Sequence, residues 1–184
     1  MAEGKPMKKP SFNLKINLID VPPTSSITKY PNISEGEKEL LGWAIVGDVC
    51  ISCDNILLSQ GIDSGPNCIA TDYVWYFLTD LHTKIPDLLK GKRVEQMFYD
   101  NPDTLTFVPE ERFVNIVFEC KCKNHEPKKE CKATLEDVLS ALLQATKKLE
   151  GELLKLNPFL ETSDELRILK KSYTDTLSLI SKHG

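Results

Sequence analysis

Residues Thr71 to Glu119 read TDYVWYFLTDLHTKIPDLLKGKRVEQMFYDNPDTLTFVPEERFVNIVFE, and this stretch decides the fold. Its first half repeats at helical spacing, with apolar side chains three and four positions apart. These side chains are Val74, Phe77, Leu78, Leu81, Ile85 and Leu88. After Gly91 the period changes to two, which is the period of a strand with one buried face. The stretch therefore predicts one long amphipathic helix followed by three short strands.

Proline and glycine divide this stretch into elements. Pro86 lies inside the helical pattern, so we expect the helix to kink or restart there and to end at Gly91. Asp100–Asp103 and Pro109–Glu111 have the composition of turns. The strands expected around them are Arg93–Tyr99, Thr104–Val108 and Phe113–Cys122. Neighbouring strands joined by such short turns predict an antiparallel meander.

Further strands are expected before the central helix. Phe12, Leu14, Ile16 and Leu18 alternate with polar residues, which is typical of a half-buried strand. Two apolar, β-rich runs follow, and the residues between them, Gly47-Asp48, resemble a tight hairpin turn. The two runs are Leu40–Val46 and Val49–Leu58.

The last third of the chain predicts two helices. Leucines at three-four spacing run from Leu135 to Leu156, Thr134 with Asp137 resembles a capping box, and Pro158 ends the first helix. Thr162 with Glu165 forms a capping box for the second helix, and the short connection predicts an αα-hairpin.

The predicted fold class is α+β, with an antiparallel sheet of five or six strands packed by the central helix and a C-terminal αα-hairpin. We expect a flexible tail over residues 1–10 and an α+β core domain over 11–132. Residues 133–184 are expected to form the helical hairpin, packed on or beside the core.

Composition indicates a globular protein. The chain has 184 residues, of which 41% are hydrophobic and 27% charged. No apolar run approaches the roughly 20 residues of a membrane-spanning helix, so no membrane partner is expected. The polar segment Met1–Lys9 is followed by no apolar stretch of a secretory signal. We therefore expect a cytoplasmic protein whose six cysteines are thiols.

Charge is distributed unevenly along the chain. Asp20–Glu111 holds 15 acidic and 6 basic residues, whereas Lys121–Lys132 holds five lysines and two glutamates. The acidic middle argues against nucleic acid, because phosphate contacts need a basic surface. It suits a basic protein partner, although acidic surfaces also serve plain solubility.

One group of residues has the ligand types of a zinc site. Cys120, Cys122, His125 and Cys131 would supply three thiolates and an imidazole, a sufficient tetrahedral set. Their spacing departs from the usual paired Cys-x2-Cys, and incidental thiols are the alternative. Cys50 and Cys53 lie in an expected strand and are interpreted as buried small residues, or less simply as part of a four-cysteine site with Cys120 and Cys122.

No catalytic motif is present, since the chain has no nucleophile elbow, no His-Glu-x2-His helix and no glycine-rich phosphate loop. Trp75, Thr79 and His82 fall on a second face of the central helix, away from its apolar stripe. Tyr and Trp are favoured anchors at interfaces, so this face is a candidate partner-binding site. The alternative is that it packs under the C-terminal hairpin.

In layout the chain resembles the small acidic cytosolic immunity proteins of bacterial toxin–immunity systems. The resemblance rests on Asp72–Glu119 and on the acidic balance of Asp20–Glu111. It implies tight binding and neutralisation of a basic toxin, often a nuclease. The first functional hypothesis is thus a non-catalytic protein-binding module without cofactor. The alternatives are a zinc-stabilised regulatory or interaction domain that uses the Cys120–Cys131 loop, and an enzyme with an unrecognised site.

Overall fold

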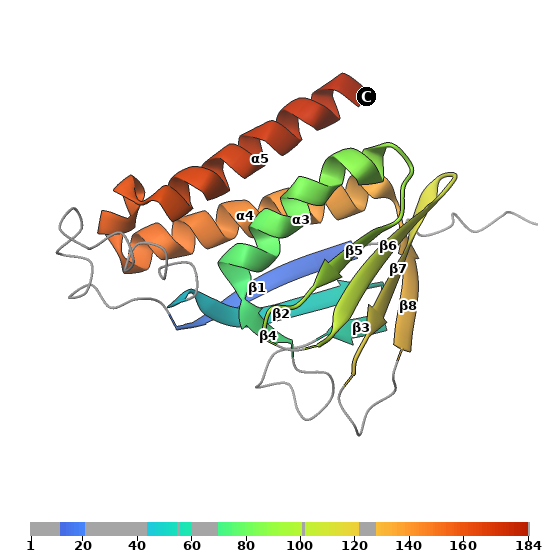
Figure 1. Cartoon of the computed structure of the whole chain (residues 1–184), viewed down its shortest axis with the longest axis horizontal. Coiled ribbons are helices and arrows are strands. Elements are labelled where there is room, and N and C mark those ends of the chain that lie inside the picture. The colour runs from blue at the N-terminus through green and yellow to red at the C-terminus, as the bar shows by residue number, and fades with distance from the viewer. Residues whose placement is uncertain are drawn as a thin grey trace, which may run out of the picture.

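The computed structural model describes residues 12–20, 44–54, 56–59, 70–100, 102–121 and 128–183 (Figure 1). These residues form two four-stranded antiparallel sheets with three α-helices. The α+β class, the antiparallel pairing, the central helix and the C-terminal helices are therefore confirmed. The strands are divided between two sheets, whereas the sequence predicted one sheet of five or six.

The first sheet is built around one central strand. Strand β2 (Val46–Cys53) pairs with β1 (Phe12–Asp20), β3 (Ile56–Ser59) and β4 (Thr71–Tyr73). The expected strand at Phe12–Leu18 is confirmed, and Phe12, Leu14 and Ile16 are buried as the alternation requires. Of the expected run Leu40–Val46, residues 40–43 lie outside the described residues.

Gly47 and Asp48 do not form the predicted turn, because β2 runs straight through them. Gly47 pairs with Leu18 on one side and with Asp72 on the other. A Cβ atom at Gly47 would lie 2.7 Å from the backbone oxygen of Asn17. The glycine therefore marks a close approach of two strands, not a reversal of the chain.

We expect the substitution Gly47→Ala to destabilise the fold by roughly 2 kcal/mol, since its methyl group meets backbone atoms that cannot move aside cheaply. Gly151→Ala is the matched control, because nothing lies within 4 Å of a Cβ at that helical position. The control should stabilise the protein by about 0.5–1 kcal/mol. Urea unfolding measures both free energies, and equal effects at the two positions would contradict the close approach.

The second sheet is a meander in chain order. It contains β5 (Val94–Met97), β6 (Thr104–Glu110), β7 (Phe113–Glu119) and β8 (Lys128–Ala133). The predicted three-strand meander is confirmed, and β8 is a strand that the sequence did not predict. Its exposed positions carry mainly lysine, and its buried residues, Cys131 and Ala133, are small, so its alternation is weak.

The central helix α3 spans Val74–Leu89 and continues through Pro86, so the predicted restart is wrong. Pro86 stands in the last turn, where its missing N–H removes only one hydrogen bond. The predicted stop at Gly91 is confirmed by its positive φ of 74°. The N–H of Gly91 donates to Leu88 O and that of Lys92 to Asp87 O, which is a Schellman ending.

The C-terminal helices are α4 (Leu135–Leu156) and α5 (Asp164–His183), joined by the 3₁₀ turn η3 (Pro158–Thr162). The predicted cap of α4 is confirmed, because Asp137 N donates to Thr134 Oγ1 at 3.1 Å. The predicted cap of α5 is wrong by one residue. Ser163 Oγ accepts from Leu166 N, since η3 occupies the chain as far as Thr162.

Helix α4 lies along the edge strand β1, and α3 lies between α5 and the sheets (Figure 1). One continuous apolar core includes side chains from both sheets and all three helices. Its aromatic contacts are Phe77–Phe98, Phe98–Phe118 and Phe12–Phe107. No helix in the described part of the chain is long and apolar enough to cross a membrane.

Candidate functional site

The face of α3 that was the candidate partner-binding site is buried by the chain's own C-terminal helices. Trp75 is only 7% exposed, and its indole Nε1 donates to the backbone oxygen of Glu165 at 2.9 Å. Thr79 is also buried, and its hydroxyl donates to Trp75 O within the helix. The face therefore packs under α5, which was the alternative to partner binding.

His82 connects all three helices. Its Nδ1 lies 2.7 Å from Thr176 Oγ1 on α5, and its Nε2 lies 2.8 Å from Thr146 Oγ1 on α4. The Thr146 hydroxyl already donates to Leu142 O, so it can only accept from the imidazole. We infer the neutral tautomer with its proton on Nε2, in which Nδ1 accepts from Thr176.

The prediction that Trp75, Thr79 and His82 bind a protein partner is therefore corrected. All three side chains are buried, and Trp75 and His82 hold neighbouring helices by hydrogen bonds. Helical periodicity placed the three residues on one face correctly. It could not show that a later segment of the chain covers that face.

Burial lowers the pKa of His82 from 6.5 to about 4, because the charged imidazolium would lose its water. Between these two pH values, His82 is thus protonated in the unfolded chain and neutral in the folded chain. The contribution of His82 to stability is complete above about pH 6.5 and declines as the pH falls toward 4.

We expect His82→Gln to remove this part of the pH dependence, which amounts to on the order of 3 kcal/mol. The measurement is the free energy of unfolding in urea at several values between about pH 7 and pH 4. Burial raises the pKa values of Asp72 and Glu165, so these two carboxyl groups make the folded protein more stable on acidification and oppose the effect of His82. Both groups are present in the unaltered and the His82→Gln protein, so their contribution cancels when the two are compared.

His183→Gln is the matched control, since His183 is exposed near the end of α5. This variant should keep the pH dependence of the unaltered protein. A His82→Gln protein that loses stability on acidification as steeply as the unaltered chain would contradict the role of His82.

The predicted zinc ligands are only partly within the described residues. Cys131 stands opposite Ile116 in the β7–β8 register, four positions from Cys120, so about 13 Å separates these cysteines along the strands. The structure does not bring them together. Cys122 and His125 lie outside the described residues. Zinc binding stays a prediction, which the metal content of the protein purified under reducing conditions would decide.

The described residues contain no group of three or more His, Cys, Asp or Glu side chains arranged to hold a metal ion. Cys50 is half-buried and accepts a hydrogen bond from Asn17 Nδ2, whereas Cys53 is buried and faces Cys131. The interpretation of this pair as small packed residues therefore fits Cys53 better than Cys50.

Several residues of the acidic stretch serve the fold and not the surface. Asp48 accepts from Thr71 Oγ1, and Asp103 accepts from the N–H of Lys121. Asp72 is fully buried, and its Oδ1 accepts from the N–H groups of Tyr99 and Asp100, which ties β4 to the end of β5. The charge count of Asp20–Glu111 thus overstates the acidity of the surface.

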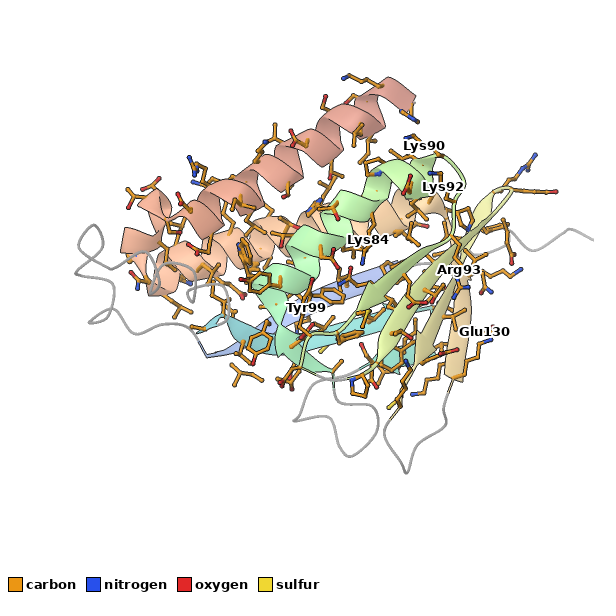
Figure 2. All side chains as sticks on the ribbon, in the orientation of Figure 1. Lys84, Lys90, Lys92, Arg93, Tyr99 and Glu130 are labelled. Atoms are coloured by element: carbon orange, nitrogen blue, oxygen red, sulfur yellow. The ribbon has the colours of Figure 1, made fainter. Side chains whose placement is uncertain are left out.

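A polar and aromatic surface lies where α3 meets β5, in which Tyr99 is exposed, Tyr76, Asp80 and Lys84 are half-buried and Gln96 is buried. Tyr76, Asp80 and Lys84 follow each other at intervals of four on α3, and Gln96 and Tyr99 come from β5 and the residues after it. We call these five residues the α3–β5 surface. Figure 2 labels Lys84 on α3 and Tyr99 in the segment that follows β5.

Hydrogen bonds hold the α3–β5 surface in place. Lys84 Nζ lies 2.8 Å from Asp80 Oδ2 and 3.2 Å from Gln96 Oε1. The phenol of Tyr99 is hydrogen-bonded to Asp80, and partial burial together with this carboxylate raises the pKa of Tyr99. The ring of Tyr99 lies 5.6 Å from that of Tyr76 and remains 43% exposed.

Basic residues border this surface at the end of α3. Lys92 forms an ion pair with Asp87, and Arg93 with Glu95, while Lys90 is exposed at the helix cap (Figure 2). Cations at a helix C-terminus are favoured by the helix dipole, so their local role is to stabilise α3.

A second surface feature is an open apolar groove between the three helices. It has a volume of about 500 Å³ and lies between the end of α3, the start of α4 and the end of α5. Its apolar lining is Leu89, Leu135, Leu139, Leu143, Leu177 and Ile180. Leu177 of α5 is 39% exposed in this groove.

Sequence reasoning missed the α3–β5 surface. The spacing of Tyr76, Asp80 and Lys84 was a usable signal, but Tyr99 reaches them only through the turn of the chain after α3. Comparison with protein-family models, curated proteins and solved structures gave no match to this chain.

Proposed function

We propose that the protein is a non-catalytic protein-binding module whose interface is the α3–β5 surface. The observation that carries this proposal is the pair of tyrosine rings, Tyr76 and Tyr99, held beside the Asp80 carboxylate on a rigid helix. Tyrosine supplies a large contact area with few rotatable bonds and is enriched at binding hot spots.

The chemistry of this surface favours a basic partner. An aromatic face attracts the ammonium of lysine and the guanidinium of arginine, and a neighbouring carboxylate adds a charge-assisted hydrogen bond. Asp80 lies within the surface, and Asp100 is exposed directly beside Tyr99. Lys84 balances part of this charge, so the proposed recognition depends on the rings as well as on acidity.

Within this class we propose a role of the immunity type, in which the protein binds and neutralises a basic toxin. The supporting features are the acidic bias of the chain and a binding surface built on ordered elements. Such a surface is pre-organised, because the Asp80–Lys84–Gln96 hydrogen bonds already fix its side chains before a partner arrives.

The test is calorimetric titration of the purified chain with the product of the adjacent gene. We expect binding that weakens as salt rises, since exposed charge pairs are screened. Tyr99→Ala should weaken binding at least about tenfold, as expected for a central interface tyrosine. Tyr99→Phe keeps the ring and loses only the hydrogen bond to Asp80, so it should bind more tightly than Tyr99→Ala.

Leu177→Ala is the control for the apolar groove, since Leu177 is about as exposed as Tyr99 and lies on α5, outside the α3–β5 surface. It should leave the affinity unchanged. Weaker binding in Leu177→Ala but not in Tyr99→Ala would move the interface to the groove and overturn the surface assignment. Failure to bind the neighbouring gene product at any salt concentration would overturn the immunity role.

A further inference from the structure

Two cysteines from different sheets meet inside the protein. Cys53 is the last residue of β2 in the first sheet, and Cys131 lies in β8 of the second. Their exposed fractions are 1% and 8%. They are 78 positions apart in the chain, so only the packing of the two sheets brings them together.

Hydrogen bonds define the contact between the two thiols. The Cys53 thiol donates to the backbone oxygen of Lys132 at 3.3 Å. Cys53 and Cys131 are also hydrogen-bonded to each other through their side chains. Because the proton of Cys53 is used on Lys132 O, the Cys131 thiol is the donor and the sulfur of Cys53 the acceptor.

A second polar contact joins the two sheets beside the cysteines. Lys129 Nζ donates to Leu57 O at 3.1 Å, which joins β8 to β3 beside the cysteines. Strand β8 pairs with β7 on its other side, so side-chain contacts make the junction with the first sheet. A covalent bond at this place would link the two sheets directly.

We propose that Cys53 and Cys131 are a disulfide-forming pair that joins the two sheets when the protein meets a small-molecule disulfide such as oxidised glutathione. The thiolate of Cys53 attacks one sulfur of glutathione disulfide and forms a mixed disulfide, and glutathione thiolate leaves and takes up a proton. The thiolate of Cys131 then attacks the sulfur of Cys53 and releases the second glutathione. The two protein thiols lose two electrons and two protons, and glutathione disulfide gains them.

The environment makes this reaction slow in the intact fold. Burial raises the pKa of Cys53 and, with the hydrogen bond to Cys53, raises that of Cys131 still further. Thiolate is therefore scarce, and the reagent reaches the pair only when the junction opens. Once formed, the bond closes a long loop, and its stabilising effect grows with loop length.

The experiment incubates the full-length chain with oxidised glutathione and maps disulfide-linked peptides by mass spectrometry. We expect a Cys53–Cys131 peptide, the loss of two hydrogens in mass, and a melting temperature raised by roughly 5–10 °C that dithiothreitol reverses. Cys131→Ala should show no such rise, whereas Cys50→Ala, which changes the half-buried cysteine of the same strand, should behave as the unaltered chain.

Peptide mapping of the unaltered protein decides the proposal even where a substituted protein fails to fold. Linkage of Cys53 to any cysteine other than Cys131 would overturn it. So would full oxidation of the other thiols while Cys53 and Cys131 remain free, or a raised melting temperature in the Cys131→Ala protein after the same treatment.

Discussion

The helical half of the structure depends on the two hydrogen bonds of His82. One imidazole joins α3 to Thr146 of α4 and to Thr176 of α5, in a place where water is excluded. A buried polar group is costly unless it is paired, so the ring fixes the position of both C-terminal helices relative to α3. The indole of Trp75 adds a third bond, to the backbone of α5 at Glu165. These polar contacts select one arrangement of helices that apolar packing alone would leave less defined.

Buried polar groups also hold parts of the sheets in place. Buried carboxylates hold backbone segments that no strand pairing reaches, as Asp72 does for Tyr99 and Asp100. Acidic residues buried in this way do not contribute to the electrostatic potential at the protein surface. Recognition of a basic partner would therefore rest on a small ordered surface, where tyrosine rings and a carboxylate lie together, and not on a broad acidic face.

The elements that the sequence predicted well are those with strong local patterns. Strand β1, the meander β5–β7 and helix α4 with its Thr134 cap each carry a clear period or a capping residue. The errors have local causes as well. Gly47 was interpreted as a turn residue because sequence cannot show that Asn17 O approaches it, and β8 was missed because lysines obscure its alternation. Helix α3 continues through Pro86 because packing of the residues on both sides offsets the helix-breaking effect of proline.

The sequence by itself determined the α+β class, the order of most elements and the apolar face of α3, because periodicity and turn composition are local properties. Tertiary structure alone decided which faces are covered. It placed α5 over Trp75 and His82, divided the strands into two sheets, and brought Cys53 to Cys131 and Tyr99 to Asp80. The physical reason is that these contacts join residues far apart in the chain. Their formation depends on the net free energy of packing whole elements together, which no local pattern of residues records.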